Sequence, residues 1–358
     1  MSSEISARHY NVDVGRMIDM VLAMPEHIRR AWEFSEDFAG RMKRRPHRIV
    51  VCGMGGSSIS GQLLRDLIGP GGAASVHIER GYALPAFAGR DTPVVCISYS
   101  GNTGETLAMY REAARRGCPL FVIASGGALI GEAEAAGSPA LTVPGGLPPR
   151  AAIGYLFTPL LRMAAAAGLI NMDEKKLGSA LEGIETLLET CRPDSDLADN
   201  GALHLAKRLY GKIPVVYSGD GLLAGAGYRW KCQLNENSKS MAFHNTFPEL
   251  GHNEIMAWDC PAKMRQDTFL IMLRDVDDHD RVRKSMDAAY AILEPLAGSA
   301  VAIDSIGAAG AAGRLSRLLS TVVMADLTSV YLAVEYGRDP TPIGKIEQIK
   351  EKLGSEDE

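Results

Sequence analysis

Short apolar segments alternate with amphipathic ones along the first half of the chain. The runs "RIVVC", "SVHIE", "PVVCI", "CPLFVIA" and "ALTV" are rich in apolar and β-branched residues, and "ETLAMYREAARRG" between two of them has helical spacing. Continuous apolar strands must be covered on both faces, so this alternation predicts a parallel sheet between two layers of helices. Residues 14–45 precede these elements with a helical pattern and end in a basic cluster, "RMKRRPHR".

The same order of elements begins again in the second half. "KIPVVYSGDGLLAGAGYRWKCQLNE" reads as a strand, a glycine-rich loop and a helix, and "TFLIMLRD" and "AVAID" read as later strands. We therefore predict two α/β domains of similar architecture. The predicted boundaries are a helical lead-in at 1–40, a first domain at 41–170, a linker helix and loop at 171–200, a second domain at 201–335, and a C-terminal loop and helix at 336–358.

One apolar stretch, residues 151–170, is long enough to imitate a membrane span. It contains Pro159 and Arg162, and much of the remainder is alanine and glycine. A charged side chain at the centre of a bilayer is costly. We therefore predict a helix buried between protein layers and no association with a membrane.

Composition narrows the class of protein. A single core rarely keeps growing in a chain of 358 residues, which agrees with two domains. The formal net charge of -5 provides no field that would attract a polyanion, so no nucleic acid partner is expected. The six cysteines are scattered without a CxxC pair, which predicts buried, reduced thiols. With no secretory signal visible at the N-terminus, these features indicate a cytoplasmic protein.

Two strand-to-helix loops of the first half are rich in glycine and hydroxyl groups: "GMGGSSISG" at 53–61 and "SYSGNTGET" at 98–106. Ligands of open parallel sheets bind beyond the carboxyl ends of the strands, where helix N-termini offer free N–H groups to an anion. Either loop alone is compatible with an ordinary turn capped by Ser or Thr. No Walker motif is present, and Ser58 occupies the third glycine position of GxGxxG. Two such loops in one domain favour a phosphorylated ligand.

Candidate catalytic residues lie in two further segments. Arg150 follows a Pro-Pro turn in "PPRAAIGY", where it is either structural or placed to stabilise an oxyanion. "CQLNENSKSMAFHNTFPELGHNEI" is the densest polar cluster of the chain, and its Glu236 is either a surface carboxylate or a proton-transfer base. A zinc site made of His244, His252 and Glu254 is a further alternative, although the spacing matches no standard helix motif.

Together these segments resemble the bifunctional phosphoglucose/phosphomannose isomerases of archaea and bacteria, within the larger sugar-isomerase (SIS) and phosphoglucose isomerase superfamily. The resemblance extends from Arg48 to Leu353 and rests on "GMGGSSISG", "SYSGNTGET", "PRAAIGY", "QLNENSK", "ELGHNEI" and "DPTPI", in that order. It implies an α/β fold of two SIS subdomains, each a flavodoxin-like parallel five-stranded sheet flanked by helices. It also implies hexose 6-phosphate substrates, a tight homodimer, and chemistry with no metal and no cofactor.

The resemblance also assigns roles to single residues. The positions that match sugar-phosphate-binding residues are Gly56, Ser57, Ser98, Ser100 and Thr103. Glu236 matches the base that moves a proton between C1 and C2, and Arg150 matches the cation that stabilises the enediolate. His252 matches the ring-opening histidine, which in such enzymes reaches the site from the neighbouring subunit.

The C-terminal segment matches two further family positions. A lysine there assists ring opening in the family; Lys350 fits this position best, and Lys345 is the alternative. Thr341 in "DPTPI" matches a threonine that leaves room for rotation about the C2–C3 bond, which favours dual activity over isomerisation of glucose 6-phosphate alone. Gly251 before the histidine and the additional His244 depart from the pattern but remove no role. The motifs indicate no purpose for the helical lead-in.

Two other functional classes are compatible with parts of this pattern. A sugar-phosphate-sensing SIS protein without activity would carry a basic DNA-reading domain, and an amidotransferase of amino sugars would carry a glutaminase segment; neither is recognised in the sequence. The sequence therefore favours an isomerase. It would interconvert glucose 6-phosphate or mannose 6-phosphate with fructose 6-phosphate by ring opening and a cis-enediolate proton transfer.

Overall fold

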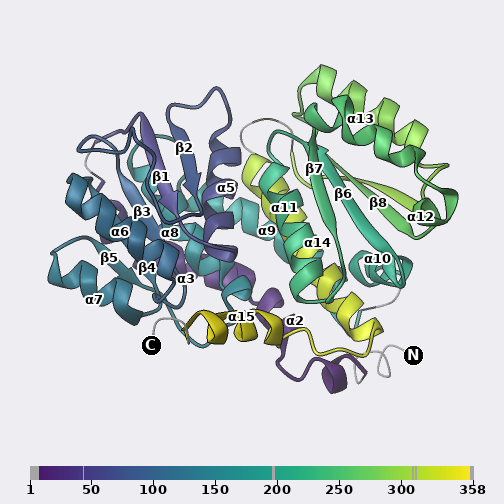
Figure 1. The fold of residues 1–358 in the computed structure, drawn as a ribbon, viewed down its shortest axis with the longest axis horizontal. Helices are drawn as coiled ribbons and strands as arrows, with labels where there is room; N and C mark the ends of the chain where they lie inside the picture. The colour runs from purple at the N-terminus through teal and green to yellow at the C-terminus, as the bar shows by residue number, and fades with distance from the viewer. Residues whose placement is uncertain (1–7, 43, 196–197, 309, 311–312, 355–358) are drawn as a thin grey trace.

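The computed structural model describes residues 8–42, 44–195, 198–308, 310 and 313–354. Two parallel sheets lie side by side, with helices between them and on their outer faces (Figure 1). The first sheet has the order β2-β1-β3-β4-β5 and comprises β1 (Arg48–Cys52), β2 (Ser75–Glu79), β3 (Val94–Ile97), β4 (Leu120–Ala124) and β5 (Ala140–Thr142). The second has the order β7-β6-β8-β9 and comprises β6 (Ile213–Gly219), β7 (Phe243–Phe247), β8 (Thr268–Arg274) and β9 (Ser299–Asp304).

The first sheet confirms the predicted five strands and has the flavodoxin-like order. The second sheet has four strands within the described residues, so the expectation of five strands in each sheet is wrong for the second. The sequence also did not predict β7. This strand lies at the sheet edge, pairs only with β6 and consists of "FHNTF", so it lacks the continuous apolar run of a strand buried on both sides.

Helices cover both faces of the first sheet because successive strand residues point to opposite sides. Val50 and Cys52 of β1 belong to the apolar cluster beneath α6 and α7, whereas Ile49 and Val51 belong to the cluster that includes α5 and α8. The helices of this half are α2 (Met17–Leu22), α3 (Met24–Phe34), α4 (Glu36–Ala39), α5 (Gly56–Ile68), α6 (Gly104–Arg116), α7 (Gly127–Ala135) and α8 (Ile153–Ala166), with the 3-10 turn η1 (Pro149–Ala151) before α8.

The second sheet is covered in the same way. The helices of this half are α9 (Glu174–Thr190), α10 (Gly201–Leu209), α11 (Ala224–Glu236), α12 (Ala262–Gln266), α13 (Asp280–Leu293), α14 (Arg314–Glu335) and α15 (Gly344–Gly354), with the 3-10 turns η2 (Glu249–His252) and η3 (Glu254–Asp259). The apolar residues of α10, α11 and α14 share one core cluster with Val216 and Ile271, and Met286 of α13 packs with Tyr217 and Met272 on the opposite face.

The two most apolar helices lie inside the protein. The residues of α8 from Ile153 to Leu161 are all buried, which confirms the prediction of a buried helix, and Arg162 pairs with Glu36 at 3.1 Å. α14 is the one helix among the described residues that is long and apolar enough to cross a membrane. In the most apolar stretch of 18 residues of α14, 89% is buried within the protein, so α14 is a core helix.

One apolar cluster joins the two halves. It contains residues of the helical lead-in, both sheets, α8 and α14, so the division of the chain into the predicted ranges stays a prediction.

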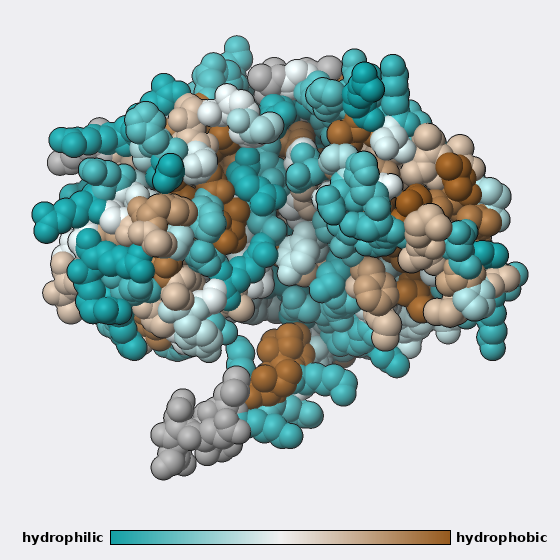
Figure 2. Space-filling model, turned by 45° about the horizontal axis from the view of Figure 1, so that its top comes forward, coloured by the Kyte–Doolittle hydropathy of each residue, from teal (hydrophilic) through white to brown (hydrophobic). Residues whose placement is uncertain are grey.

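All six cysteines are free thiols, four buried and two partly exposed. α15 stands out from the body with an apolar side (Figure 2), where Ile346 and Ile349 are 39% and 60% exposed.

Leu161 provides a test of the packing around α8. Its side chain is fully buried, so Leu161→Ala is expected to lower the free energy of unfolding by about 2–5 kcal/mol. Ile292→Ala on α13 is the control, because that side chain is 60% exposed and its loss should change stability by no more than about 0.5 kcal/mol. Urea denaturation measures both changes. Equal losses in the two variants would contradict the burial of α8.

Candidate active site

The two hydroxyl-rich loops lie side by side. β1 and β3 are neighbours in the sheet, and each loop leaves the carboxyl end of its strand at the point where the strand order reverses. The loops are in contact at Gly53, where a Cβ atom would lie 2.8 Å from the carbonyl oxygen of Ile97. The predicted sugar-phosphate-binding residues of both loops are thus gathered at one edge of the first sheet.

Internal hydrogen bonds fix the loop after β3. The hydroxyl groups of Ser98 and Thr103 share a hydrogen bond of 2.8 Å, and the N–H of Gly101 donates to Ser98 Oγ at 3.1 Å. Gly101 has φ 72°, and a Cβ there would lie 1.8 Å from the carbonyl oxygen of Gly126, so only glycine fits. Ser98 is buried and Ser100 is exposed. The hydroxyl groups of Ser98 and Thr103 are therefore committed to the structure of the loop, whereas that of Ser100 is exposed and accepts from the N–H of Asn102 at 3.3 Å.

The loop after β1 reaches the candidate cation. α5 begins at Gly56, and its first turn is held by Ser58, whose hydroxyl donates to the carbonyl of Gly55 at 2.9 Å. A Cβ atom on Gly56 would lie 3.2 Å from the carbonyl oxygen of Pro149 and 3.6 Å from Cα of Arg150. This close approach places the N-terminus of α5 directly against the backbone of Arg150.

Arg150 joins three segments that are far apart in the sequence. Its side chain is 4% exposed; Nε donates to Asn237 Oδ1 at 2.6 Å, and Nη2 donates to the carbonyl oxygens of Pro340 at 2.7 Å and Thr341 at 2.8 Å. The remaining nitrogen, Nη1, lies 3.8 Å from Glu236 Oε2. Burial lowers the pKa of Arg150, and the carboxylate of Glu236 opposes that shift. The side chain of Glu236 is 30% exposed, so it is accessible from the solvent side.

A second, fully buried ion pair supports this arrangement from beneath. Arg229 donates to both carboxylate oxygens of Asp326, at 2.9 Å and 2.7 Å, and its Nη2 also donates to the carbonyl of Arg150 at 2.8 Å. Gln233 donates to Asp326 at 2.7 Å. Since Asp326 lies on α14 and its partners lie on α11, the pair fixes these two helices and the backbone of Arg150 together.

The sequence did not identify two cations near these residues. Lys239 Nζ donates to the carbonyls of Glu236 at 2.5 Å and Pro340 at 2.9 Å, and burial, followed by the charge of Arg150, lowers its pKa to about 8. Arg80 donates to Ser58 Oγ at 3.3 Å, and its guanidinium lies 5.3 Å from the ring centre of Tyr228. Two features of the sequence could have identified these cations. Lys239 belongs to the motif "QLNENSK", and Arg80 directly follows β2, at the same end of the sheet as the two loops.

The other predicted catalytic residues lie outside this group. His252 is the last residue of η2 and is exposed, and both Lys345 and Lys350 are exposed on α15. Within the part of the chain that the structure describes, no hydrogen bond or ion pair joins any of them to Arg150 or Glu236. One chain therefore gathers the two loops, Arg150, Glu236 and the backbone of Thr341, and leaves His252 and the lysines at its surface.

Known proteins match this chain along most of its length. A family model described as the bacterial phospho-glucose isomerase C-terminal SIS domain matches residues 198–353. The bifunctional phosphoglucose/phosphomannose isomerase of Caldicellulosiruptor bescii is 36% identical over 94% of this chain and 98% of its own length. The protein of the same name from Aquifex aeolicus is 38% identical over 85% of this chain and 90% of its own length. The chain belongs to the bifunctional phosphoglucose/phosphomannose isomerase family.

The fold agrees with this family assignment. The tagatose-6-phosphate ketose/aldose isomerase of Escherichia coli superimposes with a TM-score of 0.68 over 91% of this chain and 94% of its own. At 15% sequence identity, that likeness concerns the fold alone. The strand order of both sheets and the helices on their faces are therefore those of a phosphosugar-isomerase fold.

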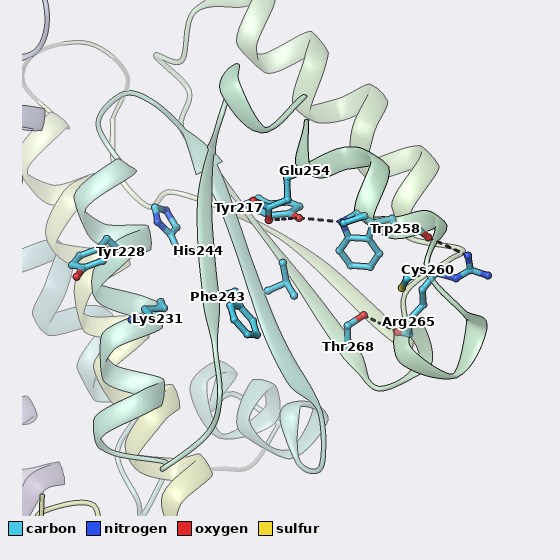
Figure 3. A pocket seen from close by; sticks show the side chains of 12 residues that line it. Tyr217, Tyr228, Lys231, Phe243, His244, Glu254, Trp258, Cys260, Arg265 and Thr268 are labelled. Atoms are coloured by element: carbon cyan, nitrogen blue, oxygen red, sulfur yellow. Dashed lines mark hydrogen bonds between the residues drawn. The ribbon is translucent and has the colours of Figure 1, made fainter. Parts of the chain in front are cut away.

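The described residues do not bring His244, His252 and Glu254 together as a zinc site. His244 lies on the α11 side of β7, where its ring is 3.3 Å from Ser218 Oγ and burial lowers its pKa to about 4 (Figure 3). Glu254 lies on the other side of β7, where it accepts hydrogen bonds from Tyr217 at 2.9 Å and Asn245 at 2.5 Å. No group of three His, Cys, Asp or Glu side chains among the described residues is placed to hold a metal ion. The 430 Å³ cavity beside β7 contains His244 and Glu254 but neither Arg150 nor Glu236.

Asp326→Ala tests the buried support beneath Arg150. The substitution leaves Arg229 charged and unpaired in the core, so we expect a loss of about 3–5 kcal/mol in the free energy of unfolding. Asp304→Ala is the matched control, because Asp304 also pairs with an arginine, at 2.9 Å from Arg274, but is 72% exposed and should contribute about 0–1 kcal/mol. Urea denaturation of both variants measures the difference, and a similarly small loss in each would refute the supporting role.

Proposed function

We propose that this chain is an aldose–ketose isomerase that interconverts glucose 6-phosphate or mannose 6-phosphate with fructose 6-phosphate. The observation that carries the proposal is the arrangement of Arg150. Two of its nitrogens are taken by protein acceptors, and the third faces the carboxylate of Glu236 beside the two hydroxyl-rich loops. A base and a cation next to an anion-binding loop are the groups that an enediolate mechanism requires. The printed names of the relatives from C. bescii and A. aeolicus agree with this activity.

The phosphate group of the substrate is bound by the two loops. The N-terminus of α5 supplies the backbone N–H of Gly56 and a partial positive charge, and Ser57 supplies its hydroxyl group, because its own N–H already donates to the carbonyl of Met54 at 3.0 Å. Ser100 and one hydroxyl group of the hydrogen-bonded pair Ser98 and Thr103 donate from the neighbouring loop. This end of the sugar does not react, so its binding positions C1 and C2 near Glu236 without taking part in the proton transfer.

Glu236 transfers the proton once the sugar ring is open. Its carboxylate removes the proton from C2 of the aldose, the electrons of the C–H bond form a C1–C2 double bond, and O1 acquires the negative charge of an enediolate. Arg150 Nη1 stabilises that charge, because a fixed cation in a buried site is already oriented when the charge forms. The proton on O2 then passes to O1, the electrons left on O2 form the C2=O bond, and the electrons of the C1–C2 double bond take the proton of Glu236 at C1, which gives the ketose. The same steps in reverse lead from fructose 6-phosphate to an aldose.

Glucose and mannose 6-phosphates give the same enediolate because they differ only at C2. One base can therefore act on both substrates when the C2–C3 bond has room to rotate. We propose that Thr341, whose carbonyl accepts a hydrogen bond from Arg150, leaves room for this rotation. All steps are proton transfers, so the proposed reaction uses no cofactor and no metal. We also propose that the enzyme acts in the cytoplasm.

The experiment that tests the activity follows both aldose products from fructose 6-phosphate, with and without EDTA. We expect glucose 6-phosphate and mannose 6-phosphate in both conditions, and no aldose at all would overturn the proposal.

Glu236→Gln should lower turnover by at least about 100-fold because it removes the base, while binding of the sugar phosphate survives. Glu182→Gln on α9, an exposed carboxylate, is the matched control and should leave turnover unchanged. Normal turnover in Glu236→Gln would reject this residue as the base.

We further propose that the enzyme is a homodimer in which His252 completes the site of the neighbouring subunit and opens the sugar ring. Support comes from its exposure on η2, away from the group around Arg150 in its own chain. The exposed apolar side of α15 offers surface that a second subunit could cover. Lys350, with Lys345 as the alternative, assists ring opening from α15.

Mixing two inactive variants tests this arrangement. Dimers that combine a Glu236→Gln chain with a His252→Ala chain have one intact site, so a 1:1 mixture after subunit exchange should regain about a quarter of the wild-type activity. A mixture of Glu236→Gln with Arg150→Met is the control, because these two residues belong to one chain and no site is restored. If the first mixture stays inactive although size-exclusion chromatography shows exchanged dimers, His252 acts within its own chain.

A further inference from the structure

Gly15 of the N-terminal segment lies directly against Thr341 of the C-terminal loop. A Cβ atom on Gly15 would lie 2.0 Å from Oγ1, 2.5 Å from Cβ and 2.8 Å from Cγ2 of Thr341. All three side-chain atoms of Thr341 therefore rest against the bare backbone of Gly15. Real Cβ atoms do not approach other atoms this closely, so any other residue at position 15 would displace Thr341.

The segment that carries Gly15 is held firmly. The carboxylate of Asp13 is fully buried and accepts hydrogen bonds from the N–H groups of Met17 and Ile18, both at 2.8 Å, at the start of α2. Met17 and Ile18 are themselves in the main core cluster. Gly15 therefore lies between Asp13, which caps the start of α2, and the helix residues anchored in the core. Moving it away from Thr341 would cost free energy, because these hydrogen bonds and core contacts would be disturbed.

Hydrogen bonds hold the backbone of the loop that carries Thr341. Arg150 and Lys239 donate to the carbonyl of Pro340, Arg150 also donates to the carbonyl of Thr341, and Asp339 accepts from the N–H of Thr341 at 2.9 Å. The hydroxyl oxygen of Thr341 is buried and has no hydrogen-bond partner in the described part of the chain. The backbone is thus fixed by hydrogen bonds, while the side chain is positioned by packing against Gly15.

We propose that Gly15 is a positioning residue that seats Thr341 and thereby sets the ratio of mannose 6-phosphate to glucose 6-phosphate formed from the common enediolate. The inference rests on the proposed function, and it gives the helical lead-in a role in specificity. A side chain at position 15 displaces Thr341 from its contact with the N-terminal segment, and Thr341 then moves toward the bound sugar. The space for rotation about C2–C3 becomes smaller, and the product that needs this rotation is formed less.

The test is the ratio of the two aldoses in the initial rates from fructose 6-phosphate, before the products equilibrate. This ratio does not depend on how much of the protein is active, so a purely structural loss leaves it unchanged. Gly15→Ala should lower the mannose-to-glucose ratio by about tenfold, the effect of one methyl-sized intrusion into a fitted pocket. Gly40→Ala is the matched control, because its Cβ would have ordinary contacts of 3.6 Å at a right-handed helical backbone, and its ratio should equal that of the wild type.

A second background separates this contact from a general disturbance. The variant Thr341→Gly lacks the three side-chain atoms that contact position 15. Adding Gly15→Ala to this variant should therefore leave its mannose-to-glucose ratio unchanged. A further change of the ratio in the double variant would overturn the proposal. If Gly15→Ala does not fold, Asp13→Asn, which replaces one acceptor at the start of α2 by a donor and loosens the segment that seats Thr341, should change the ratio from that of the wild type, and an unchanged ratio would overturn the proposal.

The outcomes distinguish this inference from the function on which it rests. A wild-type protein that forms no aldose refutes the isomerase itself. A wild-type protein that forms both aldoses, with an unchanged ratio in Gly15→Ala at a similar melting temperature, refutes only the role of Gly15.

Discussion

The structure depends on one buried guanidinium group. A charge removed from water is tolerated only where hydrogen-bond acceptors surround it, and Arg150 finds its acceptors on residues 87, 190 and 191 positions away along the chain. The end of α11, the C-terminal loop and the entrance to α8 must therefore come together before this charge is satisfied. The same requirement that completes the fold also brings Glu236 to the cation.

In the proposed reaction the two halves of the protein have different roles. The first half supplies the glycine loops and hydroxyl groups proposed to bind the phosphate, together with the cation Arg150. The second provides Glu236 at the end of α11 and, beneath it, the Arg229–Asp326 pair between α11 and α14. In the proposed mechanism, charged groups are thus concentrated where charge develops, in surroundings that are already fixed. Binding and catalysis rely on different kinds of interaction, and α5 and Arg150 are where they meet.

The sequence predicted the parts of this structure that depend on local patterns. Apolar runs and helical periodicity identified β1, α5, β3, α6, β6 and α11, and the paired glycine loops identified the sheet edge that holds them. β7 was missed because an edge strand with polar residues has no such pattern. The contacts of Arg150 with Asn237 and Thr341 could not be derived from periodicity, because hydrogen bonds across so many residues leave no trace in local composition. Lys239 was missed because it binds backbone carbonyls, which no side-chain pattern records.

Backbone anchoring of the C-terminal loop has an evolutionary consequence. Arg150 and Lys239 bind the carbonyl oxygens of Pro340 and Thr341, and every amino acid has a carbonyl oxygen. A mutation that changes the side chain at position 341 therefore keeps the anchor, and the side chain can change during evolution without loss of the contacts of Arg150. With the roles proposed for Arg150 and Thr341, selection can act on substrate preference and on catalytic power separately, and such a scaffold is well suited to diverge into enzymes for related sugars.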